Sequence, residues 1–277
     1  MASLVGVFAS SHAPLMARAW ESVDALRRDQ VTATFTELAA RLRAARPDVL
    51  VVVSPDHWVN FFLDNLPSVC IGVGETHQGP PEPWLRHLPY TSIAGHPEFA
   101  LHLARSALEE GFEPSLSHHL ELDHGFVIPL WKMGIDPLPP LVPIVVNTIE
   151  PPLPSLGRCL AWGDLVRTAI ERHPGDLRVA ILATGGVSHS IGEPDMGRID
   201  EAFDRECFEH LRASDRERLL AFLEQRLEAA GNGAAEMRNW LVAHGAAQGK
   251  EFELIGYHPC REWYVGCGFA AWNLDGR

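Results

Sequence analysis

Short, almost wholly apolar runs rich in valine, isoleucine and leucine constrain the fold of this chain more than any other feature. They are Leu4 to Ala9, Val49 to Val53, Leu141 to Asn147 and Arg178 to Thr184, and Val69 to Val73 is a shorter example. A strand covered on one face alternates polar and apolar side chains, whereas a strand covered on both faces is apolar throughout. The runs therefore predict central strands of a sheet that is buried on both sides.

Helical patterns separate these runs along the chain. Between Ala25 and Ala45, apolar residues recur at the spacing of one buried helix face. Further predicted elements are helices at Pro97 to Gly111, Leu156 to His173, Ile199 to Leu211, Asp215 to Ala230 (with Ser214 as its N-cap) and Ala234 to His244, and a last strand at Phe252 to Tyr257. This alternation predicts an α/β fold with a central, mainly parallel or mixed sheet and helices on both faces. No long polar linker divides the chain, so a single domain is predicted over residues 1–277.

The charge and the cysteines narrow the classes of function. The net charge is −13 at pH 7, and so acidic a surface repels nucleic-acid phosphates and anionic lipid. No basic segment precedes the short apolar stretch at the N-terminus, and no apolar run is long enough for a membrane span. The five cysteines are scattered without a Cys-x-x-Cys motif, which is typical of reduced thiols. We therefore expect a cytoplasmic protein that binds neither nucleic acid nor membranes.

Histidines follow three of the predicted strands. His12 comes after the first strand, His57 after the second, and His189 after the strand that ends at Thr184. Because open α/β sheets place their ligand sites at the carboxyl ends of the strands, we expect these side chains to meet. Two imidazoles and one carboxylate are the ligands of non-haem Fe(II) sites with open positions. Glu236 is a candidate carboxylate, although a glutamate at a helix start is also explained by the helix dipole.

Short motifs along the whole chain resemble those of the class III extradiol dioxygenases, the family of the protocatechuate 4,5-dioxygenase catalytic subunit and of 2,3-dihydroxyphenylpropionate 1,2-dioxygenase. They are Ser-His-Ala-Pro at 11–14, Pro-Asp-His at 55–57, Gly-His-Pro-Glu at 95–98, Asp-His-Gly at 123–125, Gly-Gly-Val-Ser-His at 185–189, and Glu236 four residues before Trp240. Each motif is short and weakly specific by itself, and their common order and spacing make the resemblance.

The resemblance implies roles for five residues. His12, His57 and Glu236 would bind Fe(II), His189 would be the acid/base residue, and His124 would line the pocket as a second hydrogen-bonding histidine. It implies insertion of both atoms of O₂ into a catechol-type ring, carboxylated as in protocatechuate or gallate, to give a semialdehyde. It also implies a homo-oligomer and permits a small accessory subunit. The tail resembles the dihydroxyphenylpropionate branch and the middle the protocatechuate branch, which leaves the substrate open.

Other interpretations remain beside this one. The same ligands could serve a Zn- or Mn-dependent hydrolase or lyase, the substrate could be a 2-aminophenol, or the protein could bind ligands without catalysis. A serine hydrolase is disfavoured because Ser190 stands where the Gly-x-Ser-x-Gly motif needs glycine. Arg261 could pair with a substrate carboxylate or form a surface ion pair, and the Pro-rich loop from Gly79 to Pro83 could be a lid or a connection.

Overall fold

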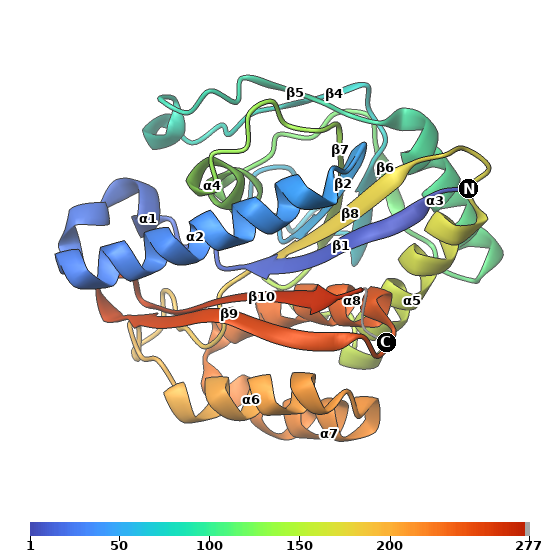
Figure 1. Ribbon diagram of the computed structural model, residues 1–277. Coiled ribbons are helices and arrows are strands. Elements are labelled where there is room, and N and C mark those ends of the chain that lie inside the picture. Colours follow the sequence, from blue (N-terminus) through green and yellow to red (C-terminus); the bar gives the residue numbers. More distant parts are fainter. Residues whose placement is uncertain (275–277) are drawn as a thin grey trace.

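A computed structural model of the protein describes residues 1–274 and contains an eight-stranded mixed sheet (Figure 1). The strand order is β6-β3-β7-β2-β8-β1-β10-β9. The strands are β1 (Ser3–Ser10), β2 (Val49–Ser54), β3 (Val69–Gly72), β6 (Ser115–Ser117), β7 (Leu141–Val146), β8 (Arg178–Thr184), β9 (Glu251–Cys260) and β10 (Val265–Asn273), and β4 (Thr76–Gln78) pairs with β5 (Ser92–Ala94) in a second sheet. The central strands β7, β2, β8 and β1 are parallel, while β3 and β10 join them antiparallel. The predicted α/β fold with a mixed sheet is confirmed.

Helices cover both faces of the sheet. On one face lie α3 (Pro97–Glu109), α5 (Leu156–Arg172), α6 (Glu201–Ala213), α7 (Arg216–Arg226) and α8 (Met237–Ala247), and on the other lie α1 (Leu15–Arg18), α2 (Ala25–Ala45) and α4 (His124–Lys132). Short 3₁₀ helices are η1 (Trp20–Ser22), η2 (Pro83–Leu85), η3 (Glu228–Ala230), η4 (Asn232–Glu236) and η5 (Arg261–Trp263). Alternate residues of β2 enter the two cores: Val51 packs on the first face and Val52 on the second. Two covered faces explain why the strand is apolar throughout.

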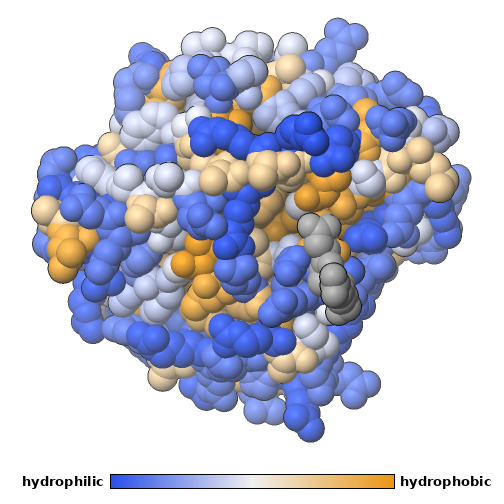
Figure 2. Space-filling model, viewed as in Figure 1, coloured by the Kyte–Doolittle hydropathy of each residue, from blue (hydrophilic) through white to orange (hydrophobic). Residues whose placement is uncertain are grey.

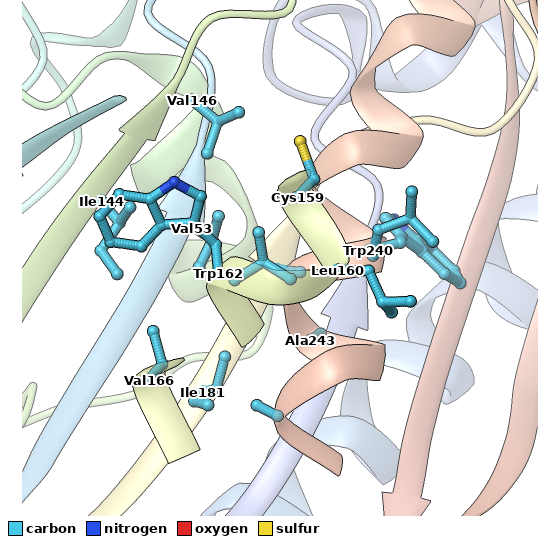
Figure 3. Close-up of a cluster of buried hydrophobic side chains, with 14 of the residues drawn as sticks. Val53, Ile144, Val146, Cys159, Leu160, Trp162, Val166, Ile181, Trp240 and Ala243 are labelled. Atoms are coloured by element: carbon cyan, nitrogen blue, oxygen red, sulfur yellow. The ribbon is translucent and has the colours of Figure 1, made fainter. Parts of the chain in front are cut away.

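Large side chains fill the first core between the central strands and the α5–α8 pair (Figure 3). Trp162 of α5 lies beside strand residues Ile144 and Val53, and Trp240 projects from α8 (Figure 3). Trp240 is fully buried. The outer surface is different: Figure 2 shows mostly polar residues on the viewed face, with smaller apolar areas between them. Within residues 1–274, no helix combines the length and the apolar composition that crossing a membrane requires.

Helices α5 and α8 approach each other closely at two glycines. A Cβ atom on Gly163 would lie 2.1 Å from the carbonyl oxygen of Val242, and one on Gly245 would lie 2.1 Å from that of Leu160. We expect Gly163→Ala to lower the free energy of unfolding by about 1–3 kcal/mol, because the backbones must move apart. Denaturant titration measures this change. Gly157→Ala is the matched control in α5, since the nearest atom to its Cβ is 3.9 Å away, and we expect it to be neutral or stabilising by up to about 1 kcal/mol. Equal effects at the two positions would contradict the packing argument.

Several predicted boundaries were wrong. Ser214 is not the N-cap of the second helix: it adopts a left-handed conformation (φ 55°) that ends α6, and Asp215 caps α7 by accepting from the Arg218 N–H. The helix predicted at Ala234 to His244 is a 3₁₀ turn followed by α8. Strand β10 and helix α4 were not predicted. The extent of a single domain over 1–277 stays a prediction.

Candidate metal centre

The loops that follow β1, β2 and β8 open into one cavity at the carboxyl edge of the sheet. The cavity has a volume of about 500 Å³, and the arrowhead of β1 marks this edge on the left of Figure 1. His12, His57 and His189 all line it, as the strand order predicts. His124, at the start of α4, and Glu236, at the end of η4, line it too. The structure therefore brings together all five side chains singled out in the sequence.

Glu236 lies at the centre of this cluster. Its Oε1 is 3.2 Å from Nε2 of His12 and 3.5 Å from Nε2 of His57. Its Oε2 accepts a hydrogen bond from the backbone N–H of Gly186 at 2.7 Å and is 3.7 Å from Nε2 of His189. The residue is 3% exposed. One carboxylate thus faces two imidazoles through one oxygen and is fixed by the β8 loop through the other.

Buried partners orient the rings of His12 and His57. Nδ1 of His12 is 3.1 Å from Oγ1 of Thr184, and Nδ1 of His57 is 2.9 Å from Oδ2 of Asp123. Asp123 also accepts from the backbone N–H of His57 at 2.7 Å. Because these contacts occupy Nδ1, both rings present Nε2 to Glu236. Such partners on the far side of an imidazole are typical of metal-binding histidines.

His124 offers a second way to complete a metal site. Its backbone N–H and its Nδ1 are 3.1 and 2.8 Å from Oε1 of Glu82, so that Nε2 is left free. Ligand atoms of His12, His57 and His124 lie within 4.8 Å of one another, as a metal ion requires. Two candidate ligand sets therefore share His12 and His57 and differ in whether Glu236 or His124 is third.

His189 is held mainly through its backbone. Its Nδ1 donates to the carbonyl oxygen of Val187 at 3.3 Å, which leaves Nε2 facing the cluster. Its carbonyl oxygen accepts from the Gly233 N–H at 3.1 Å. Asn232 holds the next turn, since its side chain bonds both the N–H and the carbonyl of Ile191 at 2.9 Å.

The charges in the cluster oppose the cost of burial. Burial raises the pKa of Glu236, but His12 and His189 outweigh this effect and lower that pKa well below its usual range. Burial lowers the pKa of His57, but Asp123 and Glu236 raise it to about 10. Burial dominates at His124 and His189, and their pKa values fall. In the absence of a metal, the cluster therefore combines an ionised Glu236 with a protonated His57 and with neutral His124 and His189. A metal ion bound to Nε2 of His57 would take the place of the proton there.

Four other residues of these loops and of the core lie beside the cluster or outside it. Asp56 caps a turn by accepting from the Val59 N–H at 3.0 Å, and Trp58 lines the cavity and is 38% exposed. Trp240 belongs to the core and does not line the cavity. Arg261 is exposed and lies outside the cavity lining.

Two polar contacts of the site were missed in the sequence. They are made by Glu82 and Thr184, which orient His124 and His12. Glu82 belongs to the Pro-rich loop, so that this loop contacts a cavity residue. In the sequence, the one sign of this contact was that the Pro-rich loop contains a carboxylate.

Comparison with known proteins agrees with this architecture. A family model described as the catalytic LigB subunit of aromatic ring-opening dioxygenase matches residues 6–265. One relative, named 2,3-dihydroxyphenylpropionate/2,3-dihydroxicinnamic acid 1,2-dioxygenase 2 and found in Pseudomonas putida, is 33% identical over 198 residues, which cover 69% of this chain. A relative from Mycobacterium ulcerans is named 2,3-dihydroxyphenylpropionate/2,3-dihydroxicinnamic acid 1,2-dioxygenase, and it is 34% identical over 191 residues, again 69% of this chain. The chain spans 58% of the length of both relatives.

One solved structure shares the fold. The crystal structure of an uncharacterized protein from Escherichia coli K12 has a TM-score of 0.64 and 16% sequence identity, and it covers 96% of this chain and 100% of that one. At this identity the likeness concerns the fold alone. The family match over nearly the whole described chain is the stronger finding. The chain belongs to the family of the catalytic LigB subunit of aromatic ring-opening dioxygenases.

Proposed function

We propose that this protein is a non-haem Fe(II)-dependent extradiol dioxygenase, which uses both atoms of O₂ to open a catechol-type ring and forms a semialdehyde. The observation that carries the proposal is the convergence of two imidazoles on one oxygen of a buried carboxylate, at 3.2 and 3.5 Å. The cavity beside them, about 500 Å³, has the size of a small-molecule site. Family membership supports the same reaction class.

We assign the metal to His12, His57 and Glu236. Imidazole nitrogen with carboxylate oxygen is the donor set of non-haem Fe(II) sites, and it leaves positions open for other ligands. When bound, Fe(II) supplies a site where substrate and O₂ meet and exchange electrons. The fixed Nδ1 contacts of both histidines favour this set, because the rings are already turned toward Glu236.

The remaining histidines act on the substrate. Nε2 of His189 accepts the proton of a substrate hydroxyl and later returns it, since Nδ1 is occupied by the carbonyl of Val187. Nε2 of His124 donates or accepts a hydrogen bond at the ring oxygens, with its orientation set by Glu82. Trp58 and Trp263 form cavity walls that exclude water from the ring.

The proposal includes a carboxylated substrate, a homo-oligomer and a cytoplasmic location. The names of the relatives support a substrate that carries a carboxylate, which in their substrates is on a side chain of the ring. An accessory subunit remains compatible with the site, since the cavity reaches the surface at Trp58. Buried free cysteines, Cys70 and Cys159 among them, support a reducing compartment.

Oxygen uptake tests the proposal. Protein purified without air and loaded with Fe(II) is offered protocatechuate, gallate, 2,3-dihydroxyphenylpropionate, catechol and 2-aminophenol. We expect O₂ consumption in equal amounts to substrate loss, with a yellow ring-opened product, on at least one compound. Protein that binds iron and consumes no O₂ with any of them would contradict the proposal, and so would protein that binds zinc and hydrolyses a substrate without O₂.

Removing the carboxylate behind His57 should weaken the metal site. We expect Asp123→Asn to lower iron affinity about 10–100-fold, because the carboxylate that orients the ring and raises its basicity is lost. Competition with a chelator measures this affinity. The matched control is Asp64→Asn, which makes the same change of charge at an exposed loop residue. An unchanged affinity in Asp123→Asn would show that His57 does not bind the metal through Nε2.

A further inference from the structure

Asp204 is a fully buried carboxylate that the proposed reaction does not use. It belongs to α6 and is 0% exposed, and it forms no salt bridge with any residue in the described part of the chain. Burial raises its pKa to about 7, although hydrogen bonds from Tyr257 and Ser188 act in the opposite direction. A buried carboxylate without a cation costs free energy, so its hydrogen bonds require an explanation.

Asp204 accepts two hydrogen bonds from a single residue, Ser188. Oδ1 of Asp204 accepts from the Ser188 backbone N–H at 2.8 Å, and Oδ2 accepts from the Ser188 hydroxyl at 2.8 Å. Oδ2 also accepts from the Tyr257 hydroxyl at 2.5 Å. The hydroxyl oxygen of Ser188 in turn accepts from the backbone N–H of Asp200 at 2.8 Å. Both the backbone N–H and the hydroxyl of Ser188 are therefore hydrogen-bonded to residues of α6 or of its N-cap.

The surrounding strand leaves room for this contact. Gly266 of β10 lies against Asp204, and a Cβ atom there would come within 2.2 Å of Oδ2. The Gly266 N–H donates to the Ser188 carbonyl at 3.0 Å, and the Val187 N–H donates to the Gly266 carbonyl at 3.0 Å. The loop after β8 is therefore clamped by α6 on one side and by β10 on the other.

The next residue in this loop is His189. Among residues 1–274, the one hydrogen bond of its ring is the 3.3 Å contact with the carbonyl of Val187, so the position of Nε2 depends on the backbone at 187–189. On its far side the loop is held by Gly233 and Asn232 of η4, the turn that ends at Glu236. Asp204 supplies the opposing anchor.

We propose that Asp204 is a positioning residue that fixes Ser188 and thereby holds Nε2 of His189 at reacting distance from the substrate hydroxyl. It acts through Ser188 and does not touch the substrate. The inference rests on the role proposed above for His189. Its effect is on rate, because a misplacement of about 1 Å in a reacting group costs about 100-fold.

Three variants separate positioning from support of the fold. Asp204→Asn loses the acceptor for the Ser188 hydroxyl, and Ser188→Ala loses the hydroxyl but keeps the backbone contact. Tyr257→Phe removes the other bond to Oδ2 and leaves both Ser188 contacts in place. We expect kcat per bound iron to fall about 10–100-fold in Asp204→Asn, less in Ser188→Ala, and less than about 2-fold in Tyr257→Phe. Iron content and KM should change less than about 2-fold in all three.

A double-mutant cycle gives the decisive readout. If Asp204 acts through His189, Asp204→Asn should reduce kcat no further in a His189→Ala background, because the group it positions is absent. A loss of the same size in both backgrounds, or a Tyr257→Phe variant as slow as Asp204→Asn, would overturn the inference. If Asp204→Asn does not fold, the cycle is carried out with Ser188→Ala.

A second readout does not depend on turnover. In nuclear magnetic resonance spectra of the zinc-loaded full chain, Asp204→Asn should shift the side-chain signals of His189 and leave those of His124 unchanged. Unshifted His189 signals would refute the positioning role. A wild-type protein that binds iron and cleaves no ring would refute the proposed function, while these spectra would still decide whether Asp204 positions His189.

Discussion

Replacing Glu236 with alanine is expected to remove metal binding and ring cleavage together. The carboxylate is the group on which His12 and His57 converge, at 3.2 and 3.5 Å, and without it the two imidazoles have no carboxylate ligand between them. Changes in residues that merely support ligands cost about 10–100-fold in metal affinity, so loss of a ligand should cost more than about 100-fold. Iron content after dialysis and chelator competition measure the loss, and oxygen uptake follows it.

The variant His124→Ala, compared with Glu236→Ala, decides which residue is the third metal ligand. The assignment of Glu236 as third ligand predicts that His124→Ala keeps its iron and loses rate or substrate affinity. If His124→Ala loses iron while Glu236→Ala keeps it, the metal is held by His12, His57 and His124, whose ligand atoms also lie within 4.8 Å. Glu193→Ala is the matched control, because Glu193 lines the same cavity but is exposed and outside the cluster. We expect it to bind iron as the wild type does.

The central sheet was predictable because its signal is local. Strands such as β2 and β8 are buried on both faces, and this alone makes them continuous apolar runs. Parallel pairing of β1, β8 and β2 then carries the histidines that follow them to one edge. The convergence of His12, His57 and His189 follows from strand order, which is why the sequence could anticipate it.

Strand β10 and helix α4 were not predicted because each contains residues that are unfavourable for its secondary structure. Strand β10 contains Gly266 and Gly268, which are poor strand formers, and both are needed because neighbouring side chains occupy the space of a Cβ. Helix α4 contains Pro129 inside it, a residue that usually ends a helix. In both cases tertiary packing overrides local propensity, and no pattern in the segment itself reveals this.

The contacts around the site were beyond sequence reasoning for a different reason. Glu82 reaches His124 from a loop before η2, and Asp204 reaches Ser188 from the start of α6. Both pairs are distant in sequence and join elements whose relative placement is set by packing. Glu236 itself was selected by resemblance, since a glutamate near a helix start has an ordinary electrostatic explanation. The structure adds its contacts with His12 and with the Gly186 N–H.

His189→Ala is expected to slow ring cleavage about 10²–10⁴-fold and to leave iron in place, because general acid–base assistance is typically worth that much. Its Nε2 is 3.7 Å from Glu236, farther than either proposed imidazole ligand. Turnover per bound iron measures the loss, and His118→Ala, at an exposed histidine, is the control. The loss should shrink for 4-nitrocatechol, whose more acidic hydroxyl needs less help in losing its proton. Full turnover of catechol by His189→Ala, or an equal loss with both substrates, would mean that His189 does not accept that proton and that the reaction begins with a different base.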